Sequence, residues 1–183
     1  EARRVGIPLI AHAMGLKEAK VALKAGASLL VHGVGDVPVD EEFLSLAREG
    51  RTIYCPTLTV VDGYRRLAEA AEKGERPVVD DPNGCVDPET LAHVALTAEA
   101  GSKTPDREQR NRRRARFETW ARIAPANLKA VRDAGIPIAM GTDAGNPLTL
   151  HGVSVYAEME AMQAAGMTPM EVLVASTRNG AEA

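Results

Sequence analysis

Short apolar runs alternate along the chain with amphipathic stretches of helical period. Each run is apolar along its whole length and ends in polar residues or glycine. The sequence predicts strands in this way at residues 7–13, 28–33, 52–58 and 136–142. Strands that are apolar throughout are typical of a parallel sheet covered on both faces, and are rare in antiparallel sheets with one wet face. The pattern therefore predicts an α/β fold.

Helices are predicted between these strands. Residues 16–25 are rich in Ala, Leu and Lys, and Gly26 stands where a helix would end. Asp40 can cap a helix that runs to residue 48. A further helix at residues 127–134 leads into the last predicted strand. Each strand is thus connected to a helix, as parallel strands require.

The connection from residue 59 to residue 135 has no strand pattern. It predicts helices at 62–73, 88–100 and 106–121, with an irregular loop at 74–87. This connection is far longer than a minimal crossover, so we expect a helical excursion over the mouth or side of the domain. Its arginine-rich run at 107–116 is typical of a solvated helix face; binding of an anionic group is the alternative.

Composition narrows the class of protein. The 183 residues suit one domain, and the hydrophobic content of 45% is ordinary for a globular protein. A formal net charge of −3 and an aromatic content of 3% give no support for a nucleic acid or an anionic membrane as partner. No apolar run approaches the ~18 residues of a membrane helix, and no signal peptide is recognisable. Cys55 and Cys85 have no CxxC spacing, so we expect free thiols and a cytoplasmic location.

Both ends of the sequence resemble cut ends. The chain opens on Glu1 without Met, and residues 179–183 still have a helical pattern. We therefore expect residues 1–183 to be a portion of one larger domain.

Ligand-type residues end three of the predicted strands. His12 ends the first strand and His32 the second; side chains at one level of neighbouring strands, ~4.8 Å apart, can reach one ion. Asp143 ends the fourth, between Gly141 and Gly145, which allow a ligand close to the backbone. Active sites of barrels and open α/β sheets lie at this rim. The alternative for each histidine is a hydrogen-bonded structural residue.

Other candidate residues carry weaker signals. His151 follows Asp143 closely, in a loop that would share its rim, and is a candidate substrate ligand. Tyr54 is a second candidate, but strand alternation leaves open which way it faces. His93 lies inside a predicted helix and is expected to fill core or surface. Arg178 is expected to be a helix-terminal cation, with a carboxylate clamp as the alternative.

These segments, in this order, resemble the metal-dependent amidohydrolase superfamily, and within it the imidazolonepropionase-like and prolidase-like enzymes. The resemblance covers nearly the whole chain apart from the excursion. The matching text lies at residues 10–15, 22–33, 56–58, 134–145, 158–166 and 168–171.

The resemblance implies a (β/α)8 TIM barrel, of which this chain would supply the last four βα units. His12 and His32 then correspond to the histidines on strands five and six that hold a divalent metal. Asp143 corresponds to the strand-eight aspartate that binds metal and orients the attacking water. The family's His-x-His and strand-four ligand have no counterpart here, and Val31 stands where close relatives usually carry Glu.

The resemblance also implies a cofactor and a reaction. One or two divalent ions are expected, zinc first, because imidazole and carboxylate donors suit that ion. The expected reaction of the complete protein is hydrolysis of an amide C–N bond, in a cyclic amide or a peptide with a C-terminal residue. Asp143 would act as catalytic acid and base. The substrate would be a small molecule or short peptide.

The N-terminal half of the same barrel is the expected partner, and homo-oligomerisation is left open. Without that half we expect exposed strand edges and no activity. The alternatives are a non-catalytic metal-binding or assembly fragment, and a hydrolase of the lactonase or phosphotriesterase kind.

Overall fold

The computed structural model describes residues 2–101 and 107–183, and the side chains of residues 4–97 and 108–183. Its sheet has three parallel strands in the order β1-β2-β3, with Ala11, Leu30 and Tyr54 side by side in the register. The strands are β1 (Ile10–His12), β2 (Leu29–Val31) and β3 (Ile53–Cys55). This confirms the first three predicted strands and the parallel α/β arrangement, although each strand is shorter than predicted.

The strand predicted at 136–142 is wrong. The segment lies beside β3 but forms only an isolated bridge among the described residues, between Tyr54 and Ile138. Tyr54 N–H donates to the Pro137 carbonyl at 2.9 Å, and Ala139 N–H donates to the Tyr54 carbonyl at 3.0 Å. Pro137 has no N–H to extend the ladder, and Met140 N–H donates away from the sheet, to Ala175. The segment therefore occupies the place of a fourth strand without forming one.

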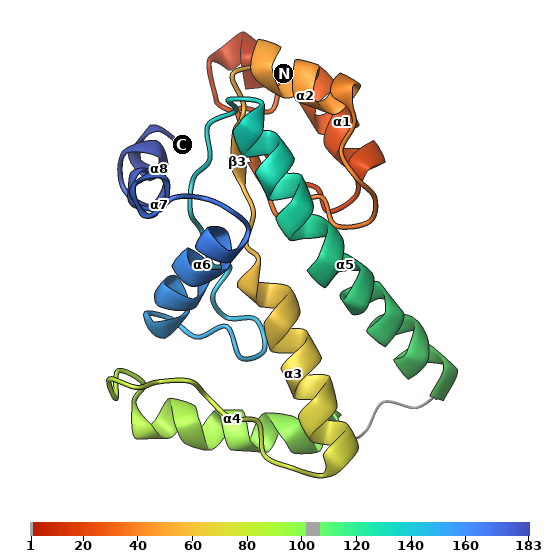
Figure 1. Cartoon of the computed structure of the whole chain (residues 1–183), viewed down its shortest axis with the longest axis vertical. Coiled ribbons are helices and arrows are strands. Elements are labelled where there is room, and N and C mark those ends of the chain that lie inside the picture. Colours follow the sequence, from red (N-terminus) through yellow and green to blue (C-terminus); the bar gives the residue numbers. More distant parts are fainter. Residues whose placement is uncertain (1, 102–106) are drawn as a thin grey trace.

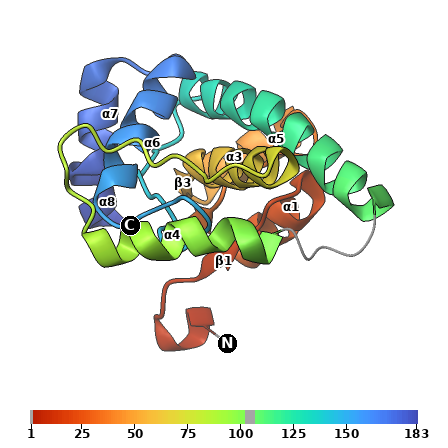
Figure 2. The same cartoon turned by 90° about the horizontal axis from the view of Figure 1, so that it is seen from below.

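Helices surround this sheet and fill the long connection after β3 (Figure 1). Figure 1 shows α4 at the far end of α3 from the sheet, and Figure 2 shows the N-terminal turn η1 standing out from the body. No helix in the described ranges is long and apolar enough to cross a membrane. The helical elements are η1 (Ala2–Val5), α1 (Leu16–Ala25), α2 (Glu41–Glu49), α3 (Thr59–Lys73), α4 (Pro88–Gly101), α5 (Arg107–Asp133), α6 (Val153–Ala164), α7 (Pro169–Ser176) and α8 (Arg178–Glu182).

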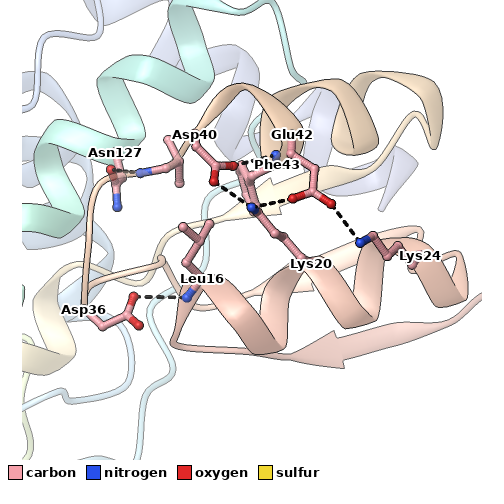
Figure 3. A network of polar contacts seen from close by, with 9 residues as sticks. Leu16, Lys20, Lys24, Asp36, Asp40, Glu42, Phe43 and Asn127 are labelled. Atoms are coloured by element: carbon pink, nitrogen blue, oxygen red, sulfur yellow. Dashed lines mark hydrogen bonds and ion pairs between the residues drawn. The ribbon is translucent and has the colours of Figure 1, made fainter.

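Ion pairs connect helices α1 and α2 (Figure 3). The Asp40 carboxylate accepts the N–H of Phe43 at 3.0 Å, which caps α2 as predicted. Lys20 of α1 donates to Asp40 at 2.6 Å and to Glu42 at 2.7 Å. Lys24 pairs with the same glutamate at 2.7 Å. These contacts fix the pair of helices whose loops carry the ends of β1 and β2.

Helix α5 is one continuous helix where the sequence predicted two. The predicted start, Asp106, lies outside the described residues, and the predicted break falls at Pro125, inside the helix. An interior proline costs ~3 kcal/mol. Apolar side chains are nevertheless buried on both sides of it, Trp120 before and Leu128 after. Burial of this stripe favours continuing the helix through the proline.

Asn127 fastens α5 to the loop that follows β2. This side chain is buried, and its amide donates to the carbonyls of Val34 at 2.8 Å and Val37 at 2.9 Å. Its oxygen accepts the N–H of Val39 at 2.9 Å (Figure 3). A buried side-chain amide whose donors and acceptor are all paired fixes the position of the backbone that it binds. The long excursion thus returns to a defined place beside the loop that begins at His32.

The two cysteines are free, as predicted: Cys55 is buried at the end of β3 and Cys85 is exposed in the loop before α4. Burial, together with the negative charges of Glu158 and Asp143, raises the pKa of the Cys55 thiol to about 12. Cys55 is therefore a neutral packing residue.

Candidate functional site

His12 and His32 come together at the carboxyl ends of neighbouring strands. His12 is the last residue of β1 and pairs in register with Val31, so that His32 directly follows the paired residues. The imidazole centroids are 4.5 Å apart and the rings meet edge to face at 75°. The two predicted ligands are thus adjacent in space.

Burial keeps His32 neutral. Its side chain is 15% exposed, and desolvation lowers its pKa, opposed by the charge of Asp143 and aided by that of His12. Nδ1 lies 2.9 Å from Oγ1 of Thr57 and 3.9 Å from Oδ2 of Asp143. A neutral imidazole with one nitrogen held by a hydrogen bond is the form in which histidine binds metals.

Backbone strain concentrates at this point. His32 has φ of 72°, Thr57 of 46° and Asp143 of 54°, all in the left-handed region. Each such residue costs on the order of 1–3 kcal/mol, and for a β-branched residue such as Thr57 the conformation is a genuine outlier. His32 lies against both of the others, 2.9 Å from Thr57 and 3.9 Å from Asp143. Backbone strain of this kind clusters at functional sites, where it orients side chains in directions that an ordinary turn does not allow.

Asn146 holds the Asp143 carboxylate. Its amide donates to Oδ2 of Asp143 at 2.8 Å and to the carbonyl of the same residue at 2.9 Å. The Asn146 oxygen in turn accepts the hydroxyl of Tyr64, on α3, at 3.0 Å. Sequence reasoning missed both residues; the signal for Asn146 was an amide three positions after the candidate aspartate.

The excursion supports this chain of hydrogen bonds. The ring of Tyr64 stacks on Phe117 of α5, with centroids 5.4 Å apart and planes at 15°. Gly63 allows the turn after Asp143 to approach α3, because a Cβ there would lie 2.2 Å from the Pro147 carbonyl oxygen. Two helices of the excursion therefore fix the carboxylate at the rim.

Glu158 is a third residue that the sequence did not single out as functional. It is fully buried, on α6, and accepts hydrogen bonds from the N–H of Leu58 at 2.7 Å and from the N–H and hydroxyl of Thr59, each at 2.8 Å. Burial raises its pKa, and these donors act in the opposite direction. The carboxylate satisfies the first donors of α3, which explains why this helix begins at Thr59 and not at Asp62. It also anchors the chain directly after the strained Thr57.

The two predicted substrate ligands are placed differently. Tyr54 is 1% exposed, its ring packs edge-on to Phe43, and its hydroxyl accepts the N–H of Val34 at 2.8 Å. A side chain buried and paired in this way is closed to a substrate, so the structure favours a supporting role beneath the loop after His32. His151 is exposed in the turn before α6, and its side chain makes no hydrogen bond or ion pair within the described parts of the chain.

The remaining sequence candidates are peripheral. His93 is exposed on α4, and its carbonyl accepts the hydroxyl of Thr97 at 3.0 Å. Arg178 begins α8 and makes a side-chain contact with its neighbour Asn179 at 3.4 Å.

A cavity of about 560 Å³ opens beside His12. Its walls come from the loops after β1 and β2 and from one face of α5, where Trp120 is nearly buried. A volume of this size is ordinary for a small-molecule site, and its position at the carboxyl ends of the strands is the usual one.

The donor types at the rim suit a zinc-like ion, but a complete ligand set is not formed. Two imidazoles and a carboxylate approach one another pairwise. Across the described residues, however, no group of three or more His, Cys, Asp or Glu side chains is arranged to hold a metal. The predicted three-ligand cluster is therefore absent from this part of the chain as it is folded. The donors fit a metal only as part of a larger set.

Comparison with solved structures finds chains of similar fold. No family model and no curated protein matches the chain. Among solved structures, a Xaa-Pro dipeptidase with methionine bound in its active site matches with a TM-score of 0.64 and 22% identity, over 99% of this chain and 34% of that one.

Two further solved structures agree. The ochratoxinase of A. niger matches with a TM-score of 0.60 and 24% identity over 98% of this chain and 31% of its own. A bottromycin amidohydrolase gives a TM-score of 0.60 and 22% identity over 99% and 41%. The chain thus has the α/β fold of one segment of such hydrolases, and spans about a third of the length of the first two.

Proposed function

We propose that the chain is the C-terminal portion of a metal-dependent hydrolase of amide bonds, built on a (β/α)8 barrel. The observation that carries this proposal is the strained cluster at the carboxyl ends of the sheet, in which His32 lies against Thr57, Asp143 and His12. The similar solved structures include a dipeptidase and an amidohydrolase, which supports a C–N bond as the one cleaved.

His12, His32 and Asp143 would hold one or two divalent ions, zinc by their donor chemistry, together with ligands from the first half of the barrel. The ion, when bound, supplies Lewis-acid activation of water and of the amide carbonyl. Asp143 takes the proton from the attacking water and delivers it to the leaving nitrogen. Asn146 keeps the carboxylate turned toward the rim for both transfers. The substrate is a cyclic amide or a peptide with a C-terminal residue.

The open edge of β1 suits the first half of the barrel as partner. In the described sheet β1 pairs only with β2, and Ile10 on this edge strand is 57% exposed. Unpaired strand edges of this kind bind another strand.

The proposal is tested on the full-length protein with a panel of dipeptides and cyclic amides, assayed before chelation, after chelation and after readdition of zinc. We expect hydrolysis before chelation, its loss after chelation and its recovery when zinc is added back. His12→Ala and His32→Ala should each lower metal affinity at least tenfold, read by elemental analysis. Amide hydrolysis that survives chelation, or an unchanged metal content in both variants, overturns it.

A further inference from the structure

The backbone does not explain why residue 57 is a threonine. Its φ of 46° lies in the left-handed region, which glycine and asparagine adopt readily and β-branched residues rarely do. The side chain is buried, with 7% of the residue exposed. A buried residue that strains the backbone where glycine would not indicates a role for its side chain.

The segment around Thr57 is fixed on both sides. The carbonyl of Pro56 accepts the N–H of Gly33 at 2.8 Å, which joins the segment to the loop after β2. Glu158 accepts the next two backbone N–H groups, at 2.7 Å and 2.8 Å. The methyl group of Thr57 lies 4.0 Å from the point where a Cβ on Gly141 would stand. The fold therefore sets the position of the Thr57 hydroxyl at the rim.

The Nδ1 atom of His32 faces two oxygen atoms with different hydrogen-bonding capacity. Oγ1 of Thr57, at 2.9 Å, can donate or accept, whereas Oδ2 of the Asp143 carboxylate, at 3.9 Å, only accepts. A lone pair on Nδ1 would face the negative charge of this carboxylate, while a proton on Nδ1 is attracted by it. These surroundings favour the neutral ring whose proton is on Nδ1 and is donated to Thr57.

This tautomer leaves the ring's lone pair on Nε2. Within the part of the chain that the structure describes, Nε2 has no hydrogen bond or ion pair. Histidine binds a metal through its unprotonated nitrogen, and the hydrogen bond made by the other nitrogen decides which one that is. Nε2 is therefore the nitrogen of His32 that is available to a metal.

We propose that Thr57 is a positioning residue for His32: its hydroxyl oxygen accepts the Nδ1–H and so leaves Nε2 as the metal-binding atom. The proposal rests on the proposed function for the metal, but the tautomer is a property of the protein without metal. It also explains the choice of residue, because the methyl group fills the space beside Gly141 while the hydroxyl holds the ring.

The tautomer is measured by ¹⁵N NMR on the full-length, metal-free protein with labelled histidine, at about pH 8, where the ring is neutral. The signals of His32 are those that are missing from the spectrum of His32→Gln. We expect Nδ1 to be protonated and Nε2 to be unprotonated. After loading with ¹¹³Cd, we expect coupling between the metal and Nε2. A protonated Nε2 in the metal-free wild type, or coupling to Nδ1, overturns the proposal.

Two variants and a control isolate the hydroxyl. Thr57→Val removes it and keeps the β-branched shape, so the backbone strain is matched. We expect a population protonated on Nε2 to appear, and zinc affinity, measured by competition with a chelator, to fall at least about tenfold. Thr57→Ser should keep the wild-type tautomer and a zinc affinity within about threefold of wild type. The control is Thr52→Val, at a buried threonine just before β3 whose hydroxyl donates to the Ala27 carbonyl at 2.7 Å; neither reading should change.

An unchanged tautomer or an unchanged zinc affinity in Thr57→Val overturns the proposal, as does a loss in Thr57→Ser as large as that in Thr57→Val. The wild-type spectrum decides the tautomer whether or not Thr57→Val folds. A protein with the expected tautomer that hydrolyses no amide would contradict the proposed function and leave the tautomer standing. Zinc-dependent hydrolysis by a protein whose Thr57→Val variant binds zinc as wild type does would contradict the role of Thr57 alone.

Discussion

The rim of the sheet and the outer end of the excursion are built in different ways. At the rim, His32, Thr57 and Asp143 have left-handed backbone conformations, and His32 lies against both of the others. At the outer end, α4 buries only Val94 among its described side chains, and the loop 74–87 is largely exposed. Strain persists only where the surroundings fix the backbone, so the rim is held by more contacts than the outer end of the excursion.

The inner parts of the excursion belong with the rim and not with α4. Tyr64 of α3 reaches Asp143 through Asn146, and Trp120 of α5 lines the cavity beside His12. The excursion therefore has two parts: an inner part that supports the residues of the rim, and an outer part that is exposed to solvent. The predictions below test this division, from the largest expected effect to the smallest.

Asp143→Asn in the full-length enzyme should lower turnover at least ~100-fold while the fold and the metal content are kept. The amide can no longer accept the proton of the attacking water. Steady-state kinetics with elemental analysis measures this. Turnover within threefold of wild type, with the metal bound, would place the proton transfer on another group.

Asn146→Ala should lower turnover about tenfold, because the Asp143 carboxylate loses the donor that orients it. Tyr64→Phe should have a smaller effect of the same kind, since it removes only the hydroxyl and keeps the stacking on Phe117. The control is Tyr156→Phe, on an exposed tyrosine of α6, which should leave kcat unchanged. Equal kcat values in all three variants would show that the excursion does not support the site.

Glu158→Gln should alter the pH dependence of stability. Burial raises the folded-state pKa of Glu158 above its ordinary value of 4.5, so its contribution to stability is full below that pH and is lost as the pH rises through the folded pKa. Wild type should therefore lose stability relative to Glu158→Gln from about pH 4.5 upward. Denaturant unfolding of both proteins between pH 4 and pH 8 measures the difference. A difference that does not change with pH contradicts the buried-carboxylate account.

Arg112→Gln, on the solvated face of α5, should change the free energy of unfolding by no more than about 0.5 kcal/mol. Its ion pair with Glu108 is between side chains that are 77% and 68% exposed. Chemical denaturation is the measurement. A loss above ~1 kcal/mol in the free energy of unfolding would be as large as the contribution of a typical hydrogen bond. Such a loss would remove the contrast between the two parts of the excursion.

Local sequence signals predicted most of the regular structure. The bounds of α1 agree at both ends with the run from Leu16 to Ala25, and Asp40 caps α2 as expected. Two local rules were overridden. Pro125 did not break α5, because apolar burial continues on both sides of it. The segment after Gly135 did not form a strand, because Pro137 has no N–H and the N–H groups of Ile136 and Met140 pair away from β3.

The sequence by itself determined the α/β class and the placement of His12 and His32 at neighbouring strand ends, because periodicity and chain order are local properties. The tertiary structure alone decided which side chains meet. Glu158 lies 99 residues from Thr59, and Tyr64 lies 82 from Asn146, so no window of sequence shows either contact. The direction of Tyr54, into the core, was decided in the same way, by which face of β3 the neighbouring helices cover.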